Sequence, residues 1–152
     1  MERTMGLTKP TPSKARPPPG TRRFGYLVAV LVNVAMLIVV NNLLAWDILP
    51  FLTSGFDRVV PIINVSLGAS ILVNLIYLSY DAGWFKALTQ IGLLGISMAA
   101  TVRLYRVFPF DFSAYEFDWA TVAKWALILA MVGVAVGIIA EIGRLAAGKT
   151  RD

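Results

Sequence analysis

The chain has 152 residues, of which 57% are hydrophobic and only 15% are charged, and its formal net charge at pH 7 is +5. Soluble domains usually contain about 45–50% apolar and about 25% charged residues, so this composition indicates a membrane protein. The sequence contains neither Cys nor His. Their absence excludes disulfides, zinc sites built from Cys or His, His-ligated haem and Ser-His catalytic triads.

The first 23 residues are basic and rich in proline, and few of them are apolar. We expect residues 1–23 to form a disordered or polyproline-like cytoplasmic tail. Such a tail could bind nucleic acid or a proline-reading domain, but it lacks interleaved aromatic residues and leads directly into an apolar segment. We therefore predict that it orients the protein and contacts anionic lipid head groups, with no nucleic-acid partner. Its basic residues are Arg3, Lys9, Lys14, Arg16, Arg22 and Arg23.

Four segments are long and apolar enough to cross a lipid bilayer, which takes roughly 20 residues of helix for about 30 Å of hydrocarbon. The first two contain no charged residue, and the last two each have 16 uncharged residues between their flanking charges. The sequence predicts an all-α membrane protein with four antiparallel helices in an up-down bundle over residues 24–146, followed by a short cytoplasmic tail at 147–152. The expected helices cover about 24–46, 59–80, 84–107 and 119–146.

The distribution of basic residues predicts the orientation of this bundle. Ten Lys or Arg lie at the two termini and in the turn between the second and third helices, against four in the two opposite loops. Because basic flanks stay on the cytoplasmic side, we expect both termini to be cytoplasmic. The chain shows no organellar targeting features, so we expect a multi-pass protein of the plasma (inner) membrane. The turn at 79–84 is short, which makes the second and third helices an antiparallel hairpin.

The two loops predicted to face outward are aromatic and acidic, over residues 46–57 and 108–119. One interpretation is an interfacial belt in which rings lie among the head groups and carboxylates remain in water. A second is that Arg103 and Arg106 pair with Asp111 or with an acid of the first loop such as Asp47, which would fix the loops as a lid. The acids do not follow the spacing of a calcium loop, and we expect no metal site.

Several amides lie within the apolar segments, where lipid offers them no hydrogen bonds. We expect these groups to turn toward neighbouring helices or the backbone and to hold the helices together. The alternative is a polar path for a solute between the first and second helices. The candidate intramembrane contacts are Asn33, Asn41, Asn64, Asn74 and Gln90.

Small residues recur along the third and fourth segments. Gly92 and Gly95 lie on the third, and Gly133 and Gly137 form a GxxxG pair on the fourth. Small residues let helix backbones approach closely, so we predict that these glycines lie at packing surfaces within the chain or against a partner.

No titratable group lies at the centre of any span, although ion-coupled transport relies on one. Small four-helix drug antiporters carry a Glu in the middle of their first span, whereas this first span offers only amides. We predict no catalytic residues and no cofactor. The sequence favours a non-catalytic accessory, assembly or scaffold subunit, as a homo-oligomer or within a larger membrane complex. The alternatives are a small oligomeric transporter or channel with an Asn-lined path, and an external ligand-binding lid formed by the loops.

Overall fold

The computed structural model describes residues 17–148. Most of the predicted N-terminal tail, residues 1–16, and the last part of the C-terminal tail, residues 149–152, lie outside the described residues. Within that range the chain is all-helical apart from its loops, and all four long helices are long and apolar enough to cross a membrane. The chain is therefore a multi-pass membrane protein, as predicted. The elements are α1 (Pro19–Asn42), the short 3₁₀ helix η1 (Ser54–Arg58), α2 (Val60–Ser79), α3 (Gly83–Val107) and α4 (Trp119–Ala146).

The bounds of α1 differ most from the sequence prediction, because the helix begins at residue 19 instead of 24 and ends at 42 instead of 46. Pro19 starts the first turn, where its missing N–H has no helical partner to lose. After residue 42 the chain turns, and Asp47 takes a left-handed backbone conformation with φ of 48°. Asp tolerates this conformation better than most residues. The segment predicted as tail therefore contributes Arg22 and Arg23 to the helix.

The beginning of α4 agrees with the prediction at 119 because the preceding residue caps it. The Oδ1 atom of Asp118 accepts a hydrogen bond from the backbone N–H of Thr121 at 3.0 Å. This satisfies one of the amides that a helix leaves unpaired in its first turn. Hydrogen bonding from the side chain of Thr121, together with this backbone bond, lowers the pKa of the Asp118 carboxyl.

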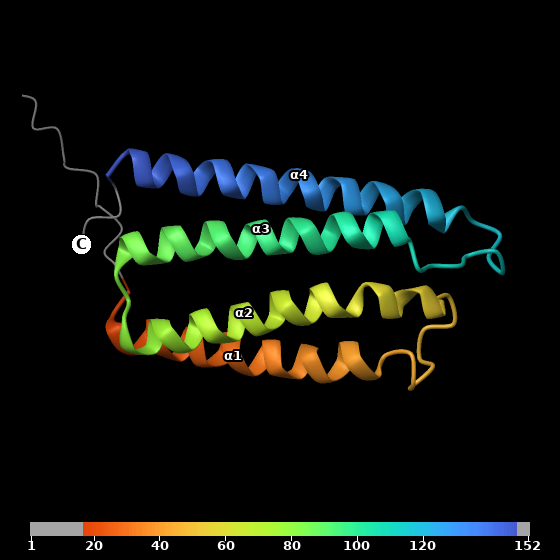
Figure 1. Cartoon of the computed structure of the whole chain (residues 1–152), viewed down its shortest axis with the longest axis horizontal. Coiled ribbons are helices and arrows are strands. Elements are labelled where there is room, and N and C mark those ends of the chain that lie inside the picture. The colour runs from red at the N-terminus through yellow and green to blue at the C-terminus, as the bar shows by residue number, and fades with distance from the viewer. Residues whose placement is uncertain (1–16, 149–152) are drawn as a thin grey trace, which may run out of the picture.

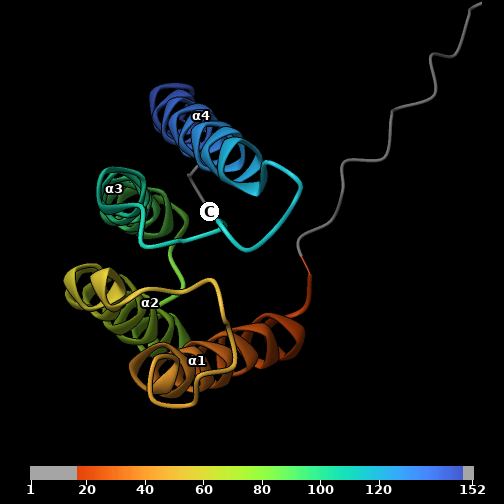
Figure 2. The ribbon, with the colours of Figure 1, turned by 90° about the vertical axis from the view of Figure 1, so that its right-hand side faces the viewer.

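The four helices run antiparallel and side by side in chain order, as Figure 1 shows. Helix α1 packs against α2, α2 against α3, and α3 against α4, and the backbones of the other helix pairs do not come close to one another. Figure 2, which looks along the helices, shows that they follow an open arc in which α1 and α4 form the two edges. Both edges are therefore left without a neighbouring helix on one side.

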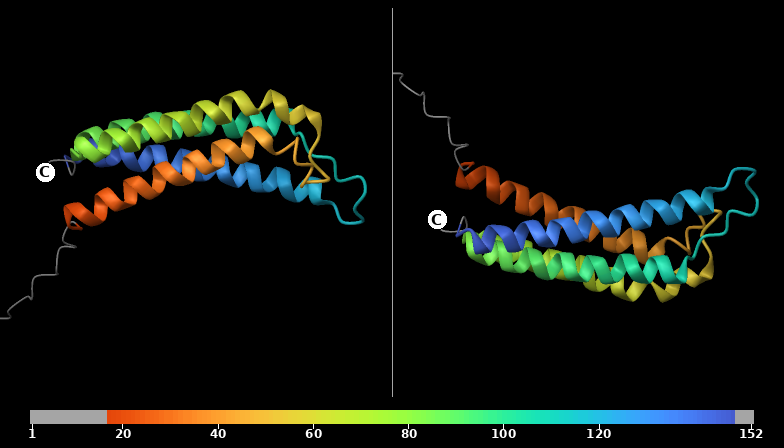
Figure 3. Two further views of the ribbon diagram at one scale, coloured as in Figure 1. Left: turned by 90° about the horizontal axis from the view of Figure 1, so that it is seen from below. Right: turned by 90° about the horizontal axis from the view of Figure 1, so that it is seen from above.

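The two ends of the helix bundle, taken along the helix axes, differ. At one end, seen in Figure 3, the described chain begins and finishes next to the α2–α3 turn; we call it the terminal end. At the opposite loop end, two backbone hydrogen bonds join the loops: Thr53 N–H to Pro109 O at 2.9 Å, and Asp111 N–H to Phe51 O at 2.7 Å. The rings of Phe51 and Phe112 stack there with centroids 5.2 Å apart. Backbone pairing and ring contacts thus join the α1–α2 hairpin to the α3–α4 hairpin.

Fully buried side chains are few and concentrate near these two ends. Val59 and Pro109 are almost completely buried at the loop end, and Tyr77 and Ala87 are buried at the terminal end. No residue of α4 is buried. Sparse burial is expected where lipid replaces water around the helices, because apolar side chains lose little by facing hydrocarbon.

Candidate functional site

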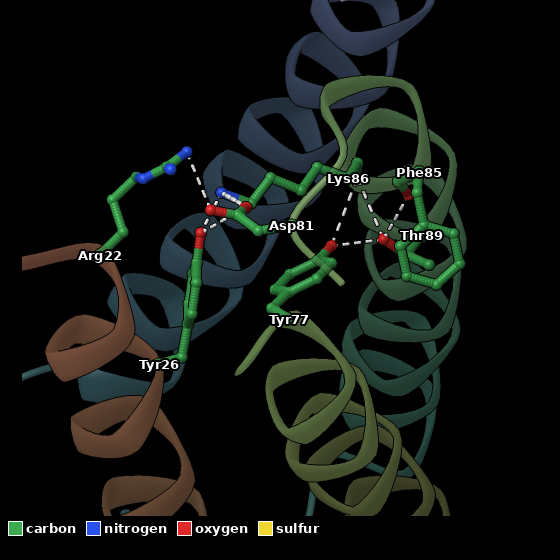
Figure 4. A network of polar contacts seen from close by, with 7 residues as sticks. All are labelled: Arg22, Tyr26, Tyr77, Asp81, Phe85, Lys86 and Thr89. Atoms are coloured by element: carbon green, nitrogen blue, oxygen red, sulfur yellow. Dashed lines mark hydrogen bonds and ion pairs between the residues drawn. The ribbon is translucent and has the colours of Figure 1, made fainter. Parts of the chain in front are cut away.

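A cluster of charged and aromatic side chains joins α1 to the α2–α3 turn at the terminal end. We call Arg22, Tyr26, Asp81 and Lys86 the Asp81 cluster, and Figure 4 shows it. Arg22 and Tyr26 lie four residues apart and so share one face of α1. Asp81 lies in the turn, and Lys86 lies in the first turns of α3. The turn between the two helices therefore presents an acid directly to α1.

Three partners surround the Asp81 carboxylate. Lys86 Nζ lies 2.6 Å from its Oδ1 atom, and Arg22 Nη1 lies 2.8 Å from its Oδ2 atom. The Tyr26 hydroxyl donates a hydrogen bond to Oδ1 at 2.9 Å, and Lys86 Nζ also donates to the Tyr26 hydroxyl oxygen. Each oxygen of the carboxylate is thus bound, so this group serves to hold α1 against the α2–α3 hairpin.

The pKa of Asp81 reflects two opposing effects. Partial burial acts to raise the pKa of the carboxyl, but hydrogen bonds from Lys86 and Tyr26, together with the charges of Lys86 and Arg22, outweigh it. The net result is a pKa below the usual Asp value, so the group is ionised at neutral pH.

Aromatic rings and hydroxyls continue this cluster between the helices. The ring centroids of Tyr26 and Tyr77 lie 5.3 Å apart, and Lys86 Nζ lies 4.7 Å from the centroid of Tyr26 and 5.5 Å from that of Tyr77. The hydroxyls of Tyr77 and Thr89 form a hydrogen bond, and Thr89 also donates to the backbone oxygen of Phe85 at 2.8 Å. The ammonium group is therefore held by a carboxylate and by two ring faces.

Beside the cluster lies a cavity of about 590 Å³ to which all four helices contribute. This is within the size range of small-molecule sites. Because the backbones of α1 and α4 do not come close to each other, no helix among residues 17–148 closes the cavity between them. The polar side chains in its wall are Tyr26, Asn74, Tyr77, Lys86, Gln90, Glu141 and Arg144.

The predicted amides occupy several different environments. Asn41 Nδ2 donates to Asn64 Oδ1 at 2.8 Å, and Asn64 Nδ2 donates back to Asn41 Oδ1 at 2.9 Å. Asn33 donates instead to the backbone oxygen four residues earlier on its own helix, as does Asn74. Gln90 lies in the wall of the cavity. The structure thus brings together one pair of amides across α1 and α2, and it does not place the others along one path.

The ion pairs predicted for the loop end are not formed in the described residues. Arg103 Nε lies 3.3 Å from the backbone oxygen of Arg58, and Asp111 Oδ1 accepts a hydrogen bond from Ser113 N–H at 2.9 Å. Neither Asp47 nor Arg106 forms an ion pair within residues 17–148. In the described residues the loops are joined by backbone hydrogen bonds and aromatic rings.

The predicted packing glycines differ in what surrounds them. A Cβ atom added at Gly137 would lie 3.3 Å from Leu94 Cδ1, so this glycine permits the close contact between α4 and α3. A Cβ atom at Gly92, Gly95 or Gly133 would meet nothing within 4 Å. Close packing within the chain therefore uses Gly137, and the other three face open space.

Sequence reasoning did not identify the Asp81 cluster, although part of its signal was present. An acid in a six-residue turn, with a Lys five residues later, indicates a local ion pair. The contribution of α1 was harder to foresee because Arg22 and Tyr26 are 55 or more residues away along the chain, and Arg22 had been assigned to the tail.

Among residues 17–148, no group of three acidic side chains lies close enough to hold a metal ion. Comparisons with protein families, with curated proteins and with solved structures find none that matches this chain.

Proposed function

We propose that this membrane protein is a non-catalytic accessory, assembly or scaffold subunit that acts through helix packing, either with further copies of itself or in a larger membrane complex. The observation that carries the proposal is the open arc, because α1 and α4 form its two edges and the backbone of each packs closely against only one of the other described helices. Another helix seated at the α4 edge would extend the arc.

The exposed face of α4 has the pattern of a helix-packing seam. Its large exposed side chains follow one another at intervals of three and four residues, which is the spacing of a coiled-coil stripe. In the sequence, a small residue directly follows every second large residue of this series, at Ala126, Gly133 and Ala140. Alternation of large and small residues allows two helices to interdigitate closely in lipid. The large residues of this α4 seam are Val122, Trp125, Leu129, Val132, Val136 and Ile139.

The distribution of charge supports a packing role over ion-coupled transport. The described charged residues lie at the two ends of the helices, and the central parts of all four spans carry none. A charged group in the bilayer centre is the usual mark of an ion or proton pathway. We further propose that the terminal end faces the cytoplasm of a plasma (inner) membrane, because most basic residues lie there.

The alternative function, an Asn-lined conduit between α1 and α2, has less support. Asn41 and Asn64 lie where such a path was expected, but their amides bind each other. Replacing Asn33, Asn41, Asn64 and Asn74 together with Leu separates the two functions. A packing subunit should continue to assemble, whereas a conduit should lose solute flux in proteoliposomes.

The packing proposal is tested by the mass of the full chain purified in mild detergent, measured by size-exclusion chromatography with light scattering. We expect a discrete assembly heavier than one 16.6 kDa chain. Gly133→Leu should reduce this assembly, because the new side chain has open space in the single chain but blocks the seam. Gly68→Leu is the matched control, since Gly68 on α2 also has open space around it. A single chain under all conditions would contradict the proposal.

A further inference from the structure

The cavity beside the Asp81 cluster combines features that recognise a phosphate group at a membrane surface. It lies within the first two turns of α1 and α3 and the last two turns of α2 and α4. That depth corresponds to the region where the head groups of a bilayer meet its hydrocarbon. A polar cavity at this level is in direct reach of lipid head groups.

The charges around the cavity leave an excess of one positive charge. Among the side chains that line it, Lys86 and Arg144 are cationic and Glu141 is anionic, while Asp81 and Arg22, which pair with each other beside Lys86, add one charge of each sign. A phosphodiester carries a single negative charge, which would balance this excess. Basic pockets between transmembrane helices are known binding places for anionic lipid head groups.

Arg144 is the residue best able to exchange partners. Its Nη1 atom lies 2.8 Å from Glu141 Oε1, but the Arg144 side chain is 64% exposed. Exposed pairs three residues apart on a helix are weak, and Arg can bind a phosphate with two parallel hydrogen bonds. Gln90, in the same wall, adds an amide that can donate a further hydrogen bond.

We propose that this cavity binds the head group of an anionic phospholipid from the surrounding leaflet, with its phosphate near Lys86 and Arg144. The acyl chains pass between α1 and α4, where no helix of the described part of the chain closes the cavity. The buried side chains of Tyr77 and Ala87 also line the cavity and provide apolar surface beneath the head group. The cavity opens toward the bilayer, which gives a lipid a direct route into it. A free phosphate ion would need only an opening to water, so this opening favours a lipid.

The test uses the full-length chain in mild detergent, with bound lipid counted by native mass spectrometry. Phosphatidylglycerol, phosphatidylcholine and inorganic phosphate are added separately. We expect one phosphatidylglycerol per chain to bind about tenfold or more tightly than phosphatidylcholine, and we expect millimolar inorganic phosphate not to displace it. Equal binding of the two lipids would overturn the proposal, as would displacement by inorganic phosphate.

Variants at Arg144 and Gln90 distinguish binding in the cavity from binding at the basic N-terminal residues, because these variants retain all of the N-terminal basic residues. Arg144→Gln should weaken phosphatidylglycerol binding about tenfold, and Arg144→Lys should recover part of it. Gln90→Leu leaves every charge in place but removes the amide that can donate to the phosphate, and it should weaken binding as well. Arg106→Gln, on α3 at the loop end, removes one positive charge elsewhere and should have no effect. Circular dichroism and monodispersity establish folding, and unchanged binding in a folded Arg144→Gln or Gln90→Leu protein would overturn the proposal.

Discussion

Asn41 on α1 and Asn64 on α2 each donate a hydrogen bond to the amide oxygen of the other, at 2.8 and 2.9 Å. Asn41 Nδ2 also donates to the backbone oxygen of Leu37 at 2.7 Å. Three of the four amide hydrogens of the pair are therefore bound, in surroundings where lipid would bind none of them. The pair links the two helices toward the loop end, opposite the Asp81 cluster.

Replacing one member of this pair should destabilise the protein more than replacing both. Asn41→Leu leaves the Asn64 amide without its partner, and we expect a loss of about 1 kcal/mol in the free energy of unfolding. The double variant with Asn64→Leu should be close to wild type, because two apolar side chains then meet. Unfolding by sodium dodecyl sulfate in mixed micelles measures the free energy of unfolding of wild type, of each single variant and of the double variant. Additive losses would show that the two amides act independently. Asn42→Leu is the control, because Asn42 binds only its own helix.

Removing the carboxylate of the Asp81 cluster should loosen α1. Asp81→Asn eliminates the charge that faces Arg22 and Lys86, and it leaves two cations close together. We expect a loss of about 2 kcal/mol in the free energy of unfolding, between the values for exposed and buried charge pairs. The same micelle titration measures this, with Asp57→Asn as the control because Asp57 is exposed on η1. Equal losses in the two variants would show that the cluster contributes no more to stability than a surface acid.

The lowered pKa of Asp81 predicts the direction of a pH dependence. The folded protein binds the proton less readily than the unfolded chain, so the stabilisation is complete above the ordinary Asp pKa of about 3.9. It is lost as the pH falls through the lower pKa of the folded state. Stability should therefore be level from pH 7 to about pH 5 and decline below about pH 4.

The Asp81→Asn variant should show a shallower decline, and not a complete absence of one. Hydrogen bonds from Ser113 lower the pKa of the Asp111 carboxyl, and those from Thr121 lower that of Asp118, so these acids contribute in the same direction. An identical pH profile for wild type and variant would mean that Asp81 is not a source of the acid sensitivity.

The two glycines of the GxxxG pair should respond differently to added side chains. Gly137→Val places new atoms against Leu94, whose Cδ1 already lies 3.3 Å from an added Cβ. Overpacking of this kind typically costs about 1–3 kcal/mol. Gly133→Val meets nothing within 4 Å, so the stability of the single chain should change little. The free energy of unfolding of both variants, measured in dilute detergent, tests this difference. Similar losses in the two variants would contradict the packing described for α3 and α4.

The aromatic contacts at the loop end should matter more than the charges there. Phe51 stacks on Phe112 and contacts Phe110, with centroids 5.2 and 6.3 Å away. Phe51→Ala should therefore lower stability by about 1–3 kcal/mol and make the two loops easier for an added protease to cleave. Ile48→Ala is the control, because Ile48 is 62% exposed. Arg103→Gln should have a smaller effect than Phe51→Ala, and the reverse order would restore the ion-pair interpretation of the loops.

Long uncharged runs of sequence were sufficient to predict the four helices, because crossing hydrocarbon requires them. The expected bounds of α4 agree closely with the observed ones, since Asp118 both ends the loop and caps the helix. The start of α1 was placed too late because Pro19 resembles a continuation of the proline-rich tail, although proline is favoured in a first helical turn.

The open arc could not be predicted in the same way. Apolar side chains that face lipid and those that face another helix have the same chemistry, so the pattern on α4 is compatible with either. The Asp81 cluster required knowing that Arg22 and Tyr26 approach a turn far along the chain. In contrast, the rule that amides in lipid turn toward neighbouring helices or the backbone included Asn41 and Asn64 among its candidates, and these two bind each other across α1 and α2.

The most direct test of the account is to ask what touches the α4 seam in native membranes. The chain has no cysteine, so a single Val132→Cys substitution can carry a photoactivatable cross-linker. The control is Val134→Cys, because Val134 is half-buried and lies three residues before Gly137, which packs against Leu94 of α3. We predict that the probe at 132 gives a discrete protein adduct heavier than 16.6 kDa and that the probe at 134 gives none between chains. If position 132 labels only lipid, the seam has no helical partner and the proposed function is contradicted.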